Sequence, residues 1–128
     1  MPSRDKPFVV LRSETGIHVV MLSDEIDHHV GVPRLEKTFA RLRTIPCAKV
    51  ILNFREVCYC CSSGIAAVLD LADAVHATGG IVLIAAAWGP AREPMDLLRI
   101  PDIIPFYDSV VEALEAIEED AVKPAPSI

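Results

Sequence analysis

Val50-Ile-Leu-Asn-Phe54 begins the stretch that decides the fold, and it leads through Arg55–Cys61 into Ser62-Ser-Gly-Ile-Ala-Ala-Val-Leu69. The first run is apolar and has the length of a strand that is buried on both faces. The last run opens a helix with an apolar side, which Gly79-Gly80 ends. A second apolar run of strand length, Ile81–Ala87, follows. A strand, a helix and a strand within about 40 residues form a βαβ unit, which implies parallel strands and a right-handed crossover.

The segments before this unit predict a hairpin and a helix. Phe8–Leu11 and Ile17–Leu22 are short β-branched runs, and the turn-forming segment Ser13–Gly16 separates them. Pro33 suits the first turn of a helix, and apolar side chains recur behind it at helical spacing until Pro46. The chain therefore enters the unit through two strands and one amphipathic helix.

The segments after this unit predict a loop, two helices and one more strand. Trp88–Arg92 is interpreted as the loop, a short helix covers Met95–Leu98, and Ile103–Phe106 is a brief strand. Ser109 and Glu112 form a capping box that opens a last helix. The side chains expected to point inward from that helix are Val111, Leu114 and Ile117. This order of elements predicts a mixed sheet with helices packed against it, all in one domain.

The composition fits one domain with an aliphatic core. The chain has 128 residues, of which 52% are hydrophobic and only 5% aromatic, so Val, Ile, Leu and Ala must build the core. The net charge of −6 argues against nucleic acid as a partner, because phosphate backbones are bound through clustered Lys and Arg. One local basic group lies on the helix after Pro33 and is interpreted as a solvated face: Arg34, Lys37, Arg41 and Arg43.

Two patterns bear on location. The first residues lack the charged start, apolar stretch and small-residue cleavage site of a signal peptide. No apolar run reaches the roughly 18 to 20 residues that a membrane-spanning helix needs. We therefore expect a cytoplasmic protein without direct membrane insertion. Its domain is expected over residues 8–117, between a flexible N-terminus, 1–7, and a flexible acidic tail, 118–128.

Two motifs resemble the STAS domain family. The strand Val50–Phe54, the short connection after it and Ser62-Ser63-Gly64 before an apolar helix look like the family signature, in which Asp-Ser-Ser-Gly precedes the helix. Leu22–His29 resembles the loop after the second strand, where the family often has Gly-x-Leu-Asp. The resemblance extends from about Phe8 to Ile117. It implies a single STAS-like α/β domain with a mixed sheet of about four to five strands and about four helices packed against it.

The resemblance also implies a binding protein rather than an enzyme, without a cofactor. An anti-sigma factor antagonist of this family binds an anti-sigma factor that is also a serine kinase, and the sigma factor is then free for transcription. Phosphorylation of the second serine of the motif ends this interaction, and a serine phosphatase restores it. Carried over by position, Ser63 is the phosphoacceptor. The resemblance implies no catalytic or metal-binding residue, and it implies the following residues in partner binding: Asp27, His28, Cys61, Ser62, Ser63 and Gly64.

Physical chemistry supports a switch at Ser63 independently of the resemblance. A serine at a helix N-terminus holds its hydroxyl near unpaired backbone N–H groups and the positive end of the helix dipole. A phosphate there would gain acceptor contacts and add about −1.5 to −2 charges. A partner surface that is desolvated on binding would tolerate that charge poorly. The plainer interpretation, that Ser62 or Ser63 merely caps a helix, stays open.

Two positions depart from the family pattern. Cys61 stands where the family has an Asp before the serine pair. Arg99 and Pro101 occupy a turn in which a small residue, often Gly, is usual. Loss of the carboxylate leaves open a different kinase, and it also leaves open a non-switching scaffold or a transporter-associated subunit.

The cysteines raise a third possibility, a redox or metal protein. Cys58-Tyr-Cys-Cys61 has C-x-x-C spacing before a helix, which is where a thiol pKa is lowered. A structural zinc site usually needs a second pair at matching spacing, and only Cys47 remains. We therefore interpret the cysteines as small buried hydrophobic residues. Alternation along a strand would place Cys58 and Cys60 on one face and Tyr59 and Cys61 on the other.

Overall fold

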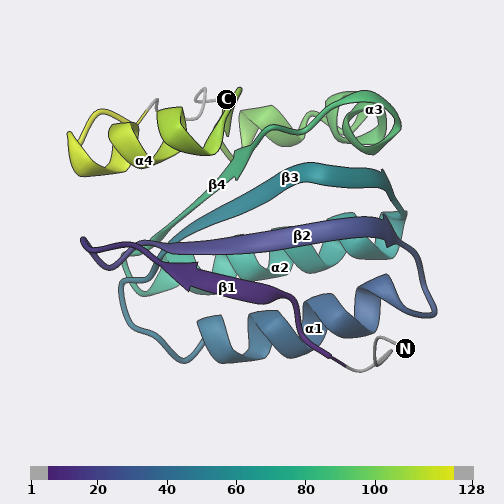
Figure 1. The fold of residues 1–128 in the computed structure, drawn as a ribbon, viewed down its shortest axis with the longest axis horizontal. Helices are drawn as coiled ribbons and strands as arrows, with labels where there is room; N and C mark the ends of the chain where they lie inside the picture. Colours follow the sequence, from purple (N-terminus) through teal and green to yellow (C-terminus); the bar gives the residue numbers. More distant parts are fainter. Residues whose placement is uncertain (1–5, 123–128) are drawn as a thin grey trace.

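A computed structural model describes residues 6–122 of the chain, and Figure 1 shows their arrangement. The elements in chain order are β1 Val9–Arg12, β2 His18–Ile26, α1 Gly31–Leu42, β3 Lys49–Cys60, α2 Ser62–Ala77, β4 Ile81–Ala85, α3 Gly89–Leu97, the 3-10 helix η1 Ile100–Asp102, β5 Phe106–Tyr107 and α4 Val110–Glu118. Of the two ends expected to be flexible, residues 1–5 and 123–128 lie outside the described part. Within residues 6–122, no helix has the length and apolar character needed to cross a membrane.

The five strands form one mixed sheet in the order β1-β2-β3-β4-β5. β1 and β2 are antiparallel and form the expected hairpin. The pairs β2–β3, β3–β4 and β4–β5 are parallel, so the expected βαβ unit is present. The prediction of a single α/β domain with a mixed sheet and about four helices is confirmed.

Alternate side chains of the sheet enter two separate cores. Leu52 and its neighbours on the same face pack under α1 and α2, where Leu71 is fully buried. Ile51 points to the other face and packs with Ile117 of α4. In Figure 1, α1 and α2 lie on one side of the sheet and α4 lies on the other. The carboxyl ends of β2, β3 and β4 meet at one edge of the sheet, and the loops at that edge carry the candidate site.

β3 is longer than the sequence predicts, and its length sets where α2 begins. Only Lys49–Asn53 pair with β4, while the rest of β3 runs beside an extended β2 until Ile26 pairs with Cys60. The segment Arg55–Cys61 was expected to be a connection, but it belongs to β3 as far as Cys60. α3 contacts β3 and contributes Met95 to the core under α1 and α2.

Two predictions near the C-terminus are wrong. The expected loop Trp88–Arg92 is helical after Trp88, because Pro90 fits the first turn of α3. The expected strand Ile103–Phe106 is mostly a turn, since the N–H of Ile104 donates to the carbonyl oxygen of Ile100 at 2.9 Å. This bond continues η1 and leaves only the last residue of the segment to join the sheet.

The last helix turns a different side to the sheet from the one its pattern predicts. Val111 is 62% exposed, and Leu114 is only partly buried. The residues of α4 that are buried are Ala113, Ala116 and Ile117. The expected cap is present, because Ser109 Oγ accepts a hydrogen bond from the N–H of Glu112. Small alanine side chains on the buried side let α4 lie close to the sheet.

Thr38 joins the start of β1 to α1. Its side chain is buried, and its Oγ1 accepts a hydrogen bond from the N–H of Phe8 at 2.8 Å. The same hydroxyl donates to the carbonyl oxygen of Arg34 at 2.8 Å. The Arg34 guanidinium in turn lies over the Phe8 ring, 4.0 Å from its centroid. One hydroxyl thus accepts from the N–H of Phe8 and donates to the carbonyl oxygen of Arg34.

We predict that Thr38→Val lowers the free energy of unfolding by about 1–3 kcal/mol, because the N–H of Phe8 would stay buried without an acceptor. Urea denaturation measures this loss. Thr44→Val is the matched control, since the Thr44 hydroxyl bonds to the Arg41 carbonyl at the exposed surface. Its effect should stay within about 0.5 kcal/mol. Equal losses in the two variants would contradict this account of Thr38.

Candidate functional site

The candidate site lies at the carboxyl ends of β2 and β3, where two distant segments meet. It consists of Asp27 and His28 in the loop after β2 and of Cys61-Ser62-Ser63-Gly64 at the start of α2. The N–H of Cys61 donates to the carbonyl oxygen of Ile26 at 2.9 Å, which fixes the two segments side by side. His28 Nδ1 lies 3.2 Å from Ser63 Oγ. The structure therefore brings together the residues that the resemblance implies in one site.

Ser63 presents its hydroxyl at the amino end of a 16-residue helix. The residue before the first helical residue is Cys61, and no side chain caps α2 there. The prediction that Ser62 or Ser63 caps the helix is wrong, because both lie within its first turn, after the capping position. Ser62 is exposed and Ser63 is partly exposed. The hydroxyl is thus available at the positive end of an uncapped helix.

Asp27 organises the loop beside Ser63. Its Oδ1 accepts hydrogen bonds from the N–H of Val30 at 2.9 Å and the N–H of Gly31 at 3.0 Å, and its carbonyl oxygen accepts from Val32. The bonds from Gly31 and Val30 lower the pKa of the Asp27 carboxyl. Asp27 therefore holds the start of α1, and through it the position of His28.

The cysteines divide into two buried and two exposed residues. Cys60 and Cys61 are buried, as expected, whereas Cys47 and Cys58 are exposed, so the prediction is wrong for that pair. The alternation fails because β2 pairs with the residues on either side of Cys58 and skips Cys58 itself, as in a β-bulge. Burial, and then the neighbouring Cys61, raise the pKa of the Cys60 thiol to about 12.

Two glycines allow both helices to approach β2. A Cβ on Gly64 would lie 2.8 Å from Cys60 Sγ and 2.9 Å from Ile26 Cγ2. A Cβ on Gly31 would lie 2.4 Å from Ile26 Cα and 2.9 Å from the carbonyl oxygen of Glu25. The glycine of the Ser-Ser-Gly motif is thus required for packing. The role of Gly31 was not predicted from the sequence. The only signal there is that a glycine stands two residues before Pro33, where the helix was expected to begin.

A groove leads away from Ser63 between α1 and α2. Its volume is about 440 Å³. Small and apolar residues line it, together with three charged side chains, and these lining residues are Val32, Glu36, Ala40, Arg43, Ser63, Ala66, Ala67 and Asp70. Because Ser63 belongs to the groove lining, a group attached to its hydroxyl would change the charge of this surface directly.

The turn after α3 shows how the chain accommodates the second departure from the family pattern. Arg99 has φ 58° and ψ 35°, which is the left-handed conformation that glycine adopts most readily. Its Nε donates to Asp102 Oδ2 at 2.7 Å. The turn is therefore kept without glycine, and Arg99 is exposed there.

Comparison with known proteins gives one family and several similar structures. The STAS domain model matches residues 9–113. A protein named anti-sigma F factor antagonist from Paenibacillus polymyxa is 26% identical over 111 residues, which is 86% of this chain and 94% of that protein. An anti-sigma factor antagonist from Mycobacterium paratuberculosis has a TM-score of 0.77 at 23% identity, covering 92% of this chain and 99% of its own. The anti-sigma factor antagonist SpoIIAA in its unphosphorylated form has a TM-score of 0.64 at 20% identity, covering 88% of this chain and 96% of its own. At these identities the two structures show a shared fold alone.

We predict that Gly31→Ala and Gly64→Ala both lower the free energy of unfolding, and that Gly31→Ala is the more harmful. Its new Cβ would meet backbone atoms, whereas the neighbours of Gly64 are side-chain atoms that can shift. We expect about 1–3 kcal/mol for Gly64→Ala and more for Gly31→Ala. Urea denaturation compares them, with Ser62→Ala at an exposed position as the control. A smaller loss in Gly31→Ala than in Gly64→Ala would contradict the close approach at Ile26.

We also predict a pH-dependent contribution from Asp27. Because folding lowers the pKa of this carboxyl, its contribution is present above the unfolded pKa of about 3.9 and disappears as the pH falls through the folded value. Asp27→Ala should therefore be less stable than the unsubstituted protein at about pH 7, and the difference should shrink below about pH 4. Denaturation curves across this range test it. Asp27→Asn, which keeps an acceptor oxygen but does not ionise, separates the hydrogen bonds from the charge. A difference that does not change with pH contradicts the prediction.

Proposed function

This chain belongs to the STAS domain family, and we propose that it is an anti-sigma factor antagonist that binds its partner while the Ser63 hydroxyl is free. The observation that carries the proposal is the accessible Ser63 hydroxyl at the uncapped start of α2, beside the loop that holds His28. The name of the Paenibacillus polymyxa relative supports the same partner class. The proposed partners are an anti-sigma factor with serine kinase activity and a serine phosphatase.

A phosphate on Ser63 would be stabilised by this chain and unfavourable for a partner. The first N–H groups of α2 could donate to the phosphate oxygens, and the helix dipole favours the negative charge. The added charge of about −1.5 to −2 would lie in the surface that continues into the groove between α1 and α2. Binding that desolvates this surface would then leave a buried charge without compensation. One phosphorylation could thus release a partner without unfolding the domain.

The proposed partner surface consists of Asp27, His28, Cys61, Ser62, Ser63 and Gly64, and its members contribute differently. Ser62, Ser63 and His28 present polar atoms to the outside. Asp27 and Gly64 set the positions of the loop and of the helix. Cys61 is buried, so its contribution is to end β3 and begin α2. We also propose the cytoplasm as the location, because the proposed partner class controls transcription.

Cys61 favours one rival, a scaffold or transporter-associated subunit that does not switch. A kinase that recognises an Asp before the serine pair would not find one in this chain. A redox protein is a weaker rival, because Cys58 of the C-x-x-C pair is exposed whereas Cys61 is buried, and both are free thiols in the structure. The described residues also contain no cluster of three or more side chains suited to hold a metal ion.

We predict that Ser63→Asp weakens binding to the anti-sigma factor by about tenfold or more, because a carboxylate would enter the desolvated surface. Ser63→Ala should bind with nearly unchanged affinity, since it adds no charge. Thr44→Asp is the matched control, because it adds the same charge beyond the end of α1, outside the proposed surface. Calorimetric titration measures the affinities. Thermal denaturation should show that each variant melts within a few degrees of the unsubstituted protein.

Intact-mass analysis of the protein isolated from its native cell completes the test. A species heavier by one phosphate, mapped to Ser63, supports the switch. Unchanged affinity of Ser63→Asp contradicts it. Isolation with a membrane complex and without a phosphorylated form would support the non-switching rival instead.

A further inference from the structure

A second candidate site lies where two neighbouring strands send the chain to opposite faces of the sheet. β4 leads into α3, whose Ala91 and Met95 join the core under α1 and α2. β5 leads into α4, whose Ala113 and Ile117 join the core on the other face. In open α/β sheets, ligands bind in crevices outside the carboxyl ends of the strands. At this place the structure has a crevice of about 440 Å³. Ser63 is not among the residues that line it.

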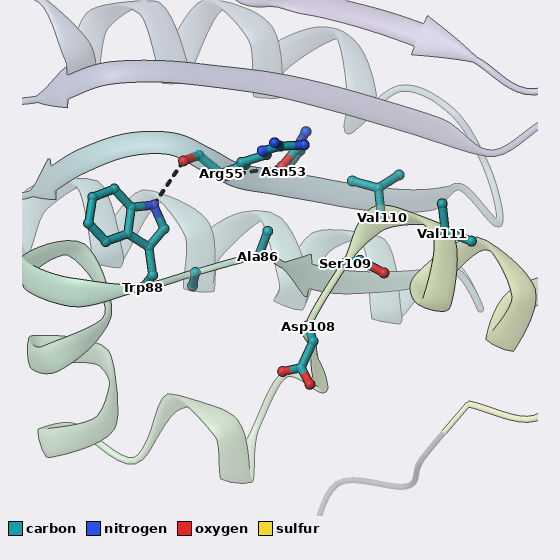
Figure 2. A pocket seen from close by; sticks show the side chains of 9 residues that line it. Asn53, Arg55, Ala86, Trp88, Asp108, Ser109, Val110 and Val111 are labelled. Atoms are coloured by element: carbon teal, nitrogen blue, oxygen red, sulfur yellow. Dashed lines mark hydrogen bonds between the residues drawn. The ribbon is translucent and has the colours of Figure 1, made fainter.

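One wall of the crevice carries polar groups whose capacity for hydrogen bonds and ion pairs the protein itself does not fully use. Asn53 is only 7% exposed; its Oδ1 accepts from the N–H of Arg55 at 3.0 Å. Its Nδ2 reaches only the thioether sulfur of Met21, at 3.7 Å, which is a weak acceptor. Within residues 6–122, no carboxylate forms an ion pair with the Arg55 guanidinium. Figure 2 shows the Arg55 side chain running back along β3 toward Asn53.

The opposite wall is the amino end of α4. Ser109, Val110 and Val111 line the crevice there. The positive end of the helix dipole therefore faces the same space as the Arg55 guanidinium. Asp108 also lines the crevice, but Figure 2 shows its carboxylate pointing away from Asn53 and Arg55. A negatively charged group between the two walls would be attracted from both sides.

A flat apolar surface completes the crevice. Trp88 is 52% exposed, yet its ring is held in place because Nε1 donates to the carbonyl oxygen of Arg55 at 2.8 Å. Val111 is exposed across from it. Ala86, which also lines the crevice, has φ 60°, a left-handed conformation that is unfavourable for alanine. Strained residues of this kind cluster at active sites and ligand-binding sites.

We propose that this crevice binds a small organic anion with a flat apolar body. The carboxylate or phosphate of the ligand lies between the Arg55 guanidinium and the amino end of α4, and the flat body stacks on Trp88. The volume of the crevice lies within the range of small-molecule sites, roughly 300–1,000 Å³. The site is separate from Ser63 and does not depend on the proposed antagonist function.

The test uses benzoate and phenyl phosphate as probes, with acetate and benzyl alcohol as controls that lack the ring or the charge. Trp88 is the only tryptophan of the chain, so its fluorescence reports directly on the crevice. We expect benzoate, phenyl phosphate or both to change this fluorescence saturably. Benzyl alcohol and acetate should bind at least about tenfold more weakly. The comparison of the two aromatic probes decides between a carboxylate and a phosphate ligand. In an NMR titration the amide signals of Ser109, Val110 and Val111 should shift most.

Arg55→Gln should weaken binding of the aromatic anions by about tenfold, because it removes the charge and the paired donors. Arg43→Gln removes an exposed arginine outside the crevice and should change nothing. Ser63→Asp should also leave probe binding unchanged, so failure here and failure of the proposed function are distinguishable. The NMR map needs no variant and decides the outcome if Arg55→Gln does not fold. Non-saturable binding, equal losses in the two arginine variants or shifts scattered over the surface would overturn the proposal.

Discussion

The close packing around Ile26 is the constraint on which the rest of this structure depends. Ile26 ends β2, is fully buried and pairs with Cys60 at the end of β3. Its carbonyl oxygen accepts the N–H of Cys61, and the missing side chains of Gly31 and Gly64 let α1 and α2 approach it from two directions. The loop of His28 and the turn of Ser63 leave from this one point. Their 3.2 Å contact is therefore a consequence of backbone packing and needs no interaction of its own to hold it.

The same sheet edge carries two different surfaces because β4 ends earlier along β3 than β2 does. β4 stops pairing with β3 at Asn53, whereas β3 continues beside β2 to Cys60. The early end of β4 opens the crevice beside Arg55 and Trp88, and the late end of β3 lifts Ser63 beyond it. A covalent change at Ser63 and a small molecule in the crevice would thus act on separate faces. The second half of β3 runs from one to the other.

The sequence predicts those parts of the fold that rest on the periodicity of apolar residues. The βαβ unit from Val50 to Ala87 follows from apolar runs of strand length. The hairpin before it follows from two β-branched runs on either side of a turn, although every residue of β1 is exposed. Local patterns were less informative where pairing with a distant strand decides the structure of a segment. Arg55–Cys61 begins with two charged residues, and the family signature has a connection there. The extended β2 nevertheless offers this segment a pairing partner, and the bulge at Cys58 then breaks the alternation. The cap of α2 was mispredicted for the same reason, since a longer β3 places Cys61 at the capping position.

The residues of the site could be predicted from the Ser-Ser-Gly motif and the loop of Asp27, but their roles could not. That Gly31 fits only without a side chain depends on distances between segments that the sequence does not encode locally. The hydrogen bonds from Val30 and Gly31 to Asp27 are local, but they depend on how the backbone turns between β2 and α1. Thr38 and Asn53 were missed for a related reason. A polar residue within an apolar pattern reveals a buried hydrogen bond only after its partner, Phe8 or Arg55, is known to lie beside it.

The exchange of the family Asp for Cys61 would affect a phosphorylated form and the free form in opposite ways. A carboxylate at the capping position would accept hydrogen bonds from the first N–H groups of α2 and partly neutralise the helix dipole. A buried thiol is a weak acceptor and leaves those N–H groups and that dipole available. The free form therefore lacks one stabilising cap, while a phosphate on Ser63 would meet donors without a competing negative charge next to it. Cys61 would thus favour a phosphate at this turn. The same residue would hinder recognition by a kinase that requires an Asp before the serine pair.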